Sequence, residues 1–247
     1  MLKQRLAIFD IDGTIFRSSL LIELINGLVE HGVFPQKAKQ EMEKEYLAWL
    51  DRKGEYDDYL AKVIQIHLKY IQNKKYADVN AVAEQVVKFM KNRVYRYTRD
   101  LLKKLKTQNF HIITISGSPT YIVSKFAKAF GFQAYFGSEY EVQNGRFTGK
   151  VLNLETFYKK AHVLNLYIEN KKLKVNFKKS LAVGDTESDV AMLELVGSPI
   201  AFNPNSGLAR IAKERGWKVI VEKDVIYEIN QFNFLHSHGS YKSRKLK

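Results

Sequence analysis

The 247-residue chain contains no cysteine, so it has neither a disulfide framework nor a nucleophilic thiolate. No apolar run approaches the roughly 20 residues that a helix needs to cross a bilayer. The first strand is expected to begin about five residues after Met1, which leaves no room for a signal peptide and favours a cytoplasmic protein. The lone histidines show no metal-ligand spacing and are expected to be structural: His31, His67, His111 and His162.

Acidic residues are few relative to basic ones, 26 against 40, which gives a formal net charge of +14 at pH 7. Such a balance can indicate nucleic-acid binding. The positive residues are dispersed, however, apart from one dense run at 171–179 and a second group in the tail. Runs of this kind are usually solvated faces, so a nucleic-acid partner is not expected; a field that steers anionic phosphate esters is the alternative. We expect the basic tail, 231–247, to be disordered.

The scarce acids gather where short apolar runs end. Residues 6–9 have the composition of a buried parallel strand, and Asp10 and Asp12 follow them, just before a glycine and a threonine. Two side chains at i, i+2 on an extended chain share a face, so the two carboxylates can converge on one point. Two carboxylates this close are costly without a cation or a proton to share. The pair therefore predicts a chemical role.

Two further apolar runs end in a similar way. Residues 180–183 precede Asp185, and residues 110–115 precede Ser116 and Gly117. In open parallel sheets, ligands bind at the carboxyl ends of the strands, so these groups are expected to share a site with the first two aspartates. Taken singly, each acid or hydroxyl could be no more than a turn residue or a helix cap. Together they point to one site.

The order of these motifs resembles the haloacid dehalogenase-like superfamily of phosphohydrolases, over residues 4–225. The matching elements are, in order, Asp10-Ile-Asp12-Gly-Thr, Ser116-Gly117, Lys160, and Gly184-Asp185 with Asp189. The Ser-Gly form of the second motif and the long insert after the first are similar to subfamily IB, the phosphoserine-phosphatase-like branch. The resemblance implies an α/β fold, with a Rossmann-like parallel sheet core and an inserted α-helical cap domain.

The resemblance also implies catalytic and metal-binding roles for the aspartates. Asp10 would be the nucleophile that becomes an aspartyl phosphate, and Asp12 the general acid and base. Mg²⁺ would be held by Asp10, Asp185 and the backbone carbonyl of Asp12. Asp189 would hold a metal-bound water or orient its loop.

Three further groups would bind the phosphoryl oxygens in such a site. The Ser116 hydroxyl and the Gly117 amide would donate hydrogen bonds, and Lys160 would neutralise charge and brace Asp10. Lys159 is adjacent in the sequence and remains an alternative to Lys160.

The segment between the first two motifs has a helical pattern. Residues 20–97 are rich in helix-forming residues, with Pro35 as the one proline. Apolar residues in 59–71 and 79–90 recur at the spacing of amphipathic helices. We expect residues 17–97 to form a cap of four or five helices over the strand ends, and 1–16 with 98–230 to form the core. A helical bundle that merely binds a partner is the alternative.

The second half of the chain predicts shorter elements. A helix is expected at 120–130, a strand near 133–138, and a β-hairpin over 140–149 with Asn144-Gly145 as its turn. A further strand at 217–222 is expected to lie at the edge of the sheet.

These expectations converge on a Mg²⁺-dependent phosphomonoester hydrolase that acts on a small phosphorylated metabolite. Asp12 favours a phosphatase or phosphomutase, since dehalogenases of the superfamily lack an acid at this position and P-type ATPases carry threonine. A phosphotransferase or phosphomutase, and phosphoserine phosphatase proper, remain alternatives within the enzymes. A basic protein that binds phosphate ligands or nucleic acid and has lost turnover is the non-enzyme alternative. The oligomeric state is left open.

Phosphoserine itself depends on residues outside the four motifs. Phosphoserine phosphatases hold the amino acid with an acidic side chain shortly after the first motif and with a cap arginine. Here Ser19 stands near that acidic position, Glu23 lies about one helical turn further on, and Arg52 is a candidate for the arginine.

Overall fold

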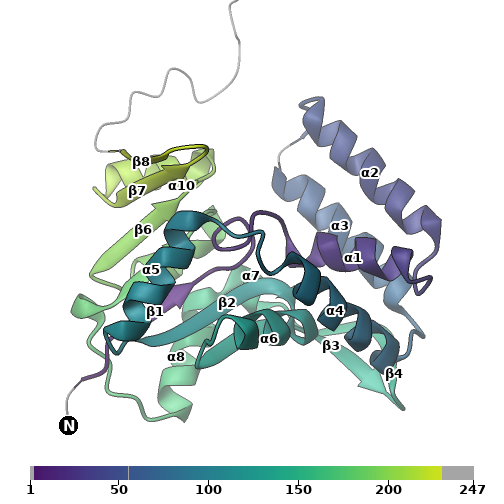
Figure 1. The fold of residues 1–247 in the computed structure, drawn as a ribbon, viewed down its shortest axis with the longest axis horizontal. Coiled ribbons are helices and arrows are strands. Elements are labelled where there is room, and N and C mark those ends of the chain that lie inside the picture. Colours follow the sequence, from purple (N-terminus) through teal and green to yellow (C-terminus); the bar gives the residue numbers. More distant parts are fainter. Residues whose placement is uncertain (1–2, 55, 230–247) are drawn as a thin grey trace, which may run out of the picture.

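The computed structural model describes residues 3–54 and 56–229, so the predicted disordered tail lies outside the described residues (Figure 1). An eight-stranded sheet with the order β4-β3-β2-β1-β5-β6-β7-β8 forms its centre. The strands are β1 (Leu6–Phe9), β2 (His111–Pro119), β3 (Ala134–Gln143), β4 (Arg146–Asn153), β5 (Leu181–Gly184), β6 (Ser198–Phe202), β7 (Lys218–Glu222) and β8 (Ile226–Ile229). Pairs from β3 to β7 are parallel, and the two outer pairs are antiparallel. The predicted α/β class is confirmed.

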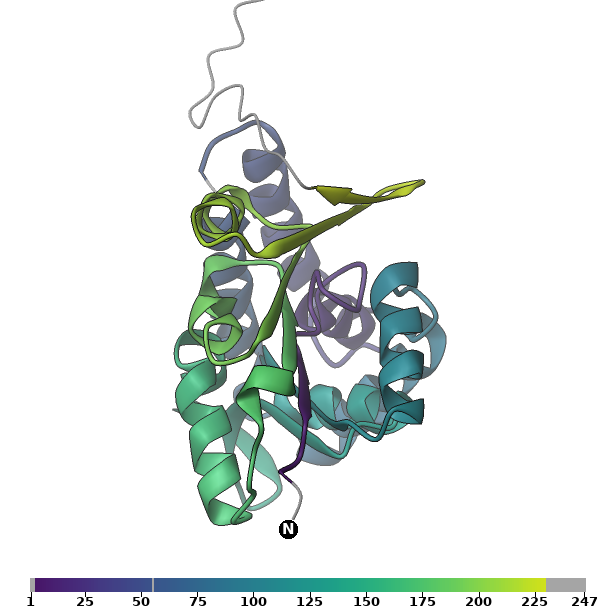
Figure 2. The ribbon, with the colours of Figure 1, turned by 90° about the vertical axis from the view of Figure 1, so that its left-hand side faces the viewer.

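Helices cover both faces of the sheet, because side chains of a strand alternate between its faces. Leu6 and Ile8 of β1 pack in one cluster with α8 (Lys160–Asn170), α9 (Val190–Leu193) and α10 (Ser206–Glu214). Ala7 and Phe9 pack in a second cluster with α5 (Arg96–Thr107) and α6 (Thr120–Ala129). Figure 2 shows α8 and α10 on one side of the sheet and α5 on the other. Both faces of β1 are thus buried, as its uninterrupted apolar run predicts.

The strand order brings the three acidic or hydroxylic strand ends together. β1 lies at the centre, and the chain adds β2 and β3 on one side of it before it returns to add β5, β6 and β7 on the other. The carboxyl ends of β2, β1 and β5 are therefore neighbours at one edge of the sheet. The point where the order reverses, between β1 and β5, is where open α/β sheets form their ligand crevice.

Four helices follow β1 before α5 begins: α1 (Leu20–Glu30), α2 (Gln36–Leu50), α3 (Tyr56–Ile71) and α4 (Tyr76–Met90). The helical character predicted for 59–71 and 79–90 is confirmed. The buried side of the insert includes Leu24, Val63 and Val82, and it joins the same hydrophobic cluster as Phe9. The insert is consequently packed onto one face of the sheet as well as lying beside its strand ends (Figure 1).

The insert leaves and rejoins the core at adjacent points. Phe16 forms an antiparallel bridge with Val94. The Arg17 amide donates a hydrogen bond of 2.9 Å to the carbonyl of Arg93, and the Tyr95 amide donates one of the same length to Ile15. These contacts support the predicted division into a core of 1–16 with 98–230 and a cap of 17–97, which remains a proposal.

The remaining predicted elements agree with the structure except at one edge. The helix near 120–130, the strand near 133–138 and the Asn144-Gly145 turn are confirmed as α6, β3 and the β3–β4 hairpin. The prediction that 217–222 is an edge strand is wrong, since β8 pairs with β7 in antiparallel register. β8 is only four residues long, which made this short return strand hard to recognise.

Two further features bear on the charge and on membranes. The basic run at 171–179 follows α8 and includes a short 3-10 helix, η1 (Phe177–Lys179). Its Val175 bridges to Gln4 ahead of β1, so the run lies at the opposite end of the strands from the acids. Among the described residues, no helix combines the length and the apolar character that crossing a bilayer requires.

Candidate active site

The centre of the site is a buried lysine between two aspartates. Asp10 follows β1, Lys160 begins α8, and Asp189 ends the short 3-10 helix η2 (Glu187–Asp189). Lys160 Nζ donates one hydrogen bond to Asp10 Oδ1 and one to Asp189 Oδ1, and each has a length of 2.6 Å. All three side chains are at most 6% exposed. Charge-assisted hydrogen bonds in such a dry environment hold Asp10 in one orientation.

The structure distinguishes Lys160 from its neighbour Lys159. Lys160 lies on the buried side of the α7 (Glu155–Tyr158) to α8 junction, whereas Lys159 is 65% exposed and reaches Glu155 at 3.8 Å. Burial alone would lower the pKa of Lys160, but the carboxylates of Asp10 and Asp189 raise it above its usual value. Lys160 is therefore a fixed cation within the site, and Lys159 is a surface residue.

Asp185 enters the site from the end of β5, the strand next to β1. Its Oδ1 accepts a hydrogen bond of 3.1 Å from the Thr14 hydroxyl. Gly13, between Asp12 and Thr14 of the first motif, has a φ of +79°, and a Cβ there would lie 2.0 Å from Asp185 Oδ2. Only glycine tolerates both that backbone conformation and this approach. The Asp-Gly-Thr sequence thus brings the β1 loop directly against the β5 acid.

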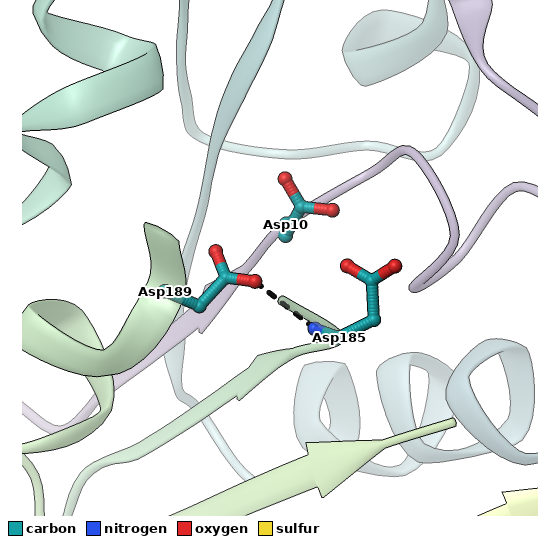
Figure 3. Close-up of side chains that lie close together, drawn as sticks. All are labelled: Asp10, Asp185 and Asp189. Atoms are coloured by element: carbon teal, nitrogen blue, oxygen red, sulfur yellow. Dashed lines mark hydrogen bonds between the residues drawn. The ribbon is translucent and has the colours of Figure 1, made fainter. Parts of the chain in front are cut away.

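Asp189 is held by backbone as well as by Lys160. Its Oδ2 accepts hydrogen bonds from the amides of Asp185 and Thr186, over 3.0 and 3.1 Å. Figure 3 shows Asp10, Asp185 and Asp189 converging from three segments, with the Asp189 bond to the Asp185 amide drawn. Asp189 therefore fixes the loop that carries Asp185, as well as being an acid of the cluster.

Asp12 has a different set of partners. Its Oδ2 accepts hydrogen bonds from the hydroxyls of Ser116 (2.7 Å) and Ser118 (2.9 Å), and its Oδ1 accepts one from the Leu20 amide (2.5 Å). Asp10 and Asp12 line the same cavity, as their i, i+2 spacing predicts. Only Asp10 reaches Lys160, however, so the two acids are in chemically distinct surroundings.

Burial shifts the pKa of three of the acids in the same direction. It raises the pKa of Asp10 to about 7; Lys160 opposes this shift, while Asp189 and Asp12 add to it. Burial also raises the pKa of Asp12, against the hydrogen bonds from Leu20, Ser116 and Ser118. The pKa of Asp185 lies well above its usual value because of burial and the nearby charges of Asp10 and Asp189. One lysine is thus insufficient to balance the negative charge of the site.

The acidic group fits a divalent cation. Asp10, Asp185 and Asp189 each offer a carboxylate oxygen, and these oxygens lie within 4.8 Å of one another. Oxygen ligands of this kind are what Mg²⁺ prefers, and its charge would balance the excess of carboxylates. The Asp12 carboxylate is not part of this group. That the backbone carbonyl of Asp12 binds the metal stays a prediction.

Asp10, Asp12, Asp185, Lys160 and Gly117 line one cavity, whereas Asp189 and Ser116 are fully buried and do not line it. The core residues that line it, together its core wall, are Asp10, Asp12, Gly117, Ser118, Phe157, Lys160, Asp185, Thr186 and Ser188. Ser116 is fully buried behind this wall and bonds to Asp12. The prediction that Ser116 binds phosphoryl oxygens is therefore untested, and the structure shows Ser116 as a partner of Asp12.

Several cavity residues had not been singled out in the sequence. Ser118 lies two residues after Ser116 on β2, and the i, i+2 rule that linked Asp10 to Asp12 could have found it. Phe157 lines the cavity from α7, and Leu60 and Ile64 from α3. No sequence signal distinguishes these apolar residues from others that only fill the core.

Comparison with known proteins agrees with this geometry. Residues 7–194 match the family model described as haloacid dehalogenase-like hydrolase. Phosphoserine phosphatase SerB1 of Mycobacterium tuberculosis is 25% identical over 223 residues, which cover 86% of this chain and 69% of that protein. A histidinol-phosphatase of Neisseria meningitidis is 24% identical over 221 residues, covering 88% of this chain and 98% of the relative. The predicted resemblance to the phosphoserine-phosphatase-like branch is confirmed.

Solved structures share the fold. A protein with unknown function from Bordetella pertussis superposes with a TM-score of 0.71 at 21% identity, over 88% of this chain and 98% of its own. A structure described as a phospho-aspartyl intermediate analogue of phosphoserine phosphatase superposes with a TM-score of 0.60, also at 21% identity, over 90% and 95% of the two chains. Since the family model spans most of the chain and the motif residues meet at one cavity, the protein belongs to the haloacid dehalogenase-like hydrolase family and is a hydrolase.

Proposed function

We propose that the protein is a Mg²⁺-dependent phosphatase that hydrolyses a small phosphomonoester through an aspartyl phosphate on Asp10. Uncatalysed hydrolysis of phosphate monoesters is extremely slow, and a covalent intermediate divides it into two displacements with lower barriers. The phosphatase names of several relatives support this reaction class. Magnesium, held by Asp10, Asp185 and Asp189, would supply charge neutralisation for the phosphoryl group.

The observation that carries the proposal is the orientation of Asp10. One of its oxygens is fixed by Lys160 at 2.6 Å, and Lys160 is the one residue of the described chain that donates a hydrogen bond to it. Asp10 lines the cavity although the residue is only 4% exposed. The second oxygen is thus available to attack phosphorus.

Asp12 is suited to move the protons of the reaction. Burial raises its pKa, so Asp12 holds a proton more readily than an exposed aspartate does; it would give that proton to the leaving alkoxide and take one back from the attacking water. Hydrogen bonds from Ser116, Ser118 and the Leu20 amide orient it throughout. Separate partners for Asp10 and Asp12 give the two acids separate roles.

The proposal is tested by trapping the intermediate. The protein is mixed with p-nitrophenyl phosphate and Mg²⁺, quenched in acid and digested, and the peptides are analysed for phosphate. We expect an acid-stable, hydroxylamine-labile phosphate on the peptide that contains Asp10, and hydrolysis that stops when the metal is chelated. Phosphate on another residue, or hydrolysis that is independent of metal, would contradict the proposal.

Phosphotransfer to an acceptor other than water remains the second candidate. The same aspartyl phosphate would serve both reactions, and they differ only in the molecule that attacks it. Release of inorganic phosphate in proportion to p-nitrophenol supports hydrolysis. A deficit of phosphate that grows with added alcohol acceptors supports transfer.

A further inference from the structure

The two walls of the cavity differ in charge. Each charged side chain that lines it among the described residues belongs to the core: Asp10, Asp12, Lys160 and Asp185. The insert contributes Leu21, Leu60 and Ile64, together with Ser19. Leu60 and Ile64 are four residues apart on α3, so they lie on the same face of that helix, and Leu21 lies in the first turn of α1.

Phe157 extends the apolar surface from the core side. A Cβ at Gly117 would lie 2.5 Å from Cδ2 of Phe157, so the ring packs directly on the glycine of the second motif. The same ring lines the cavity. Phe157 and the leucine and isoleucine side chains of the insert thus line one cavity together with the acids, so a group bound next to the phosphoryl position meets apolar surface from both the core and the insert.

The charged residues that could hold an amino-acid leaving group are elsewhere. Glu23 is the acid nearest to Ser19 in α1, and it accepts a 2.9 Å hydrogen bond from the Ser18 hydroxyl. Arg52 lies after α2, with a φ of +61°, and is exposed. Neither residue lines the cavity. An ammonium or carboxylate placed against Leu60 and Ile64 would lose water without gaining a side chain of opposite charge, which is unfavourable.

We propose that the leaving group of the substrate carries no charge and is bound by its apolar surface between Phe157 and the Leu21, Leu60 and Ile64 wall. The inference rests on the proposed phosphatase function and specifies its substrate class. Ser19, Thr186 and Ser188 also line the cavity, and a hydroxyl is the only polar group that their side chains offer to a leaving group. Such a site disfavours phosphoserine as the substrate, because the insert residues that line the cavity offer no opposite charge to the ammonium and carboxylate of its amino acid.

Two esters of nearly equal shape test this inference. Isobutyl phosphate replaces the ammonium and carboxylate groups of O-phospho-L-serine with two methyl groups. We expect its kcat/KM, measured with Mg²⁺, to exceed that of phosphoserine by about tenfold or more, since an unpaired buried charge costs at least this factor. Isobutanol is the poorer leaving group of the two, so this preference cannot arise from intrinsic reactivity. A higher kcat/KM for phosphoserine would overturn the inference.

A pair of variants locates the source of the preference. Leu60→Arg places a cation in the insert wall, and Gln65→Arg places the same cation on the exposed side of the same helix. We expect Leu60→Arg to lower the ratio of kcat/KM for isobutyl phosphate over phosphoserine by about tenfold, and Gln65→Arg to leave that ratio unchanged. Equal shifts in both variants would contradict a role for the wall.

The assay separates this inference from the proposed function. Hydrolysis of p-nitrophenyl phosphate that depends on Mg²⁺, combined with a preference for phosphoserine, overturns the inference and leaves the proposed function in place. Absence of metal-dependent hydrolysis of any of the three esters overturns both.

Discussion

The core wall and the insert wall of the cavity are built on opposite principles. The core wall contains buried acids and one lysine that are held by named hydrogen bonds, whereas the insert wall contains aliphatic side chains. A polar group buried in a core must find partners, so its position is fixed to within a hydrogen bond. An aliphatic wall imposes shape alone. Under the proposed function, the core would carry out the reaction and the insert would select the leaving group.

Replacing Asp10 gives the largest expected effect, because it removes the proposed nucleophile from the core wall. Asp10→Asn should lower Mg²⁺-dependent hydrolysis of p-nitrophenyl phosphate by about a thousandfold or more. The similar shape of asparagine should preserve the circular dichroism spectrum. Residual turnover within tenfold of the wild type would show that the attacking oxygen belongs to another residue.

Removing Lys160 should affect both stability and activity. Lys160→Ala leaves the buried carboxylates of Asp10 and Asp189 without their cation, and loss of one partner of a buried ion pair costs about 3–5 kcal/mol. Urea denaturation measures the free energy of unfolding. The matched variant Lys159→Ala should change it by less than about 0.5 kcal/mol, because that lysine is a surface residue. Equal effects of the two substitutions would contradict the assignment of Lys160.

The packing of the insert helix α3 against the core helix α6 should make the stability of the protein depend on pH. His67 of α3 is fully buried, and Nε2 hydrogen-bonds the hydroxyl of Tyr121 of α6 over 2.8 Å. The rings packed against it belong to Phe34, Tyr121 and Tyr140, none of which is charged in acid. Burial lowers the pKa of His67 to about 3, from 6.5. Below pH 6.5 the unfolded chain therefore binds a proton that the folded chain does not, and stability falls as the pH decreases toward 3.

The measurement compares the wild type with His67→Gln at two pH values. The contribution of His67 should lower the free energy of unfolding of the wild type by about 2 kcal/mol between pH 7 and pH 5. The glutamine variant should lack this part of the change, while the acids of the site contribute equally to both proteins. Identical pH dependence in the two proteins would show that His67 is protonated in the folded state.

Replacing Ser118 should give the smallest of these effects. It compares a partner of Asp12 with the proposed nucleophile Asp10 within the core wall. Ser118→Ala removes one of the hydroxyls that bind Asp12, and a hydrogen bond to a charged group is worth about 1.5 kcal/mol or somewhat more. We expect kcat/KM for p-nitrophenyl phosphate to fall about tenfold. Ser124→Ala is a suitable control, because its hydroxyl bonds the Tyr121 carbonyl within α6. A loss equal to that of Asp10→Asn would indicate that Ser118 contacts the phosphoryl group itself.

The sequence alone determined the reactive half of the site. Apolar runs that end in Asp10, Ser116 and Asp185 specify parallel strands, and the carboxyl ends of such strands must share an edge of the sheet. The amphipathic period of 59–71 likewise specified a helix, because a 3.6-residue repeat buries one face. These features are local in the chain, or follow from rules that hold for every parallel sheet.

The tertiary structure decided what depends on distance across the fold. The two adjacent lysines are indistinguishable in the sequence, and only the packing of the α7–α8 junction buries Lys160 between Asp10 and Asp189. Ser116 contacts Asp12 because the ends of β1 and β2 are neighbours. Leu60 and Ile64 line the cavity because α3 packs beside those strand ends. Apolar side chains lack the directional bonds that would mark such positions in a sequence, so their role appears only when the chain is folded.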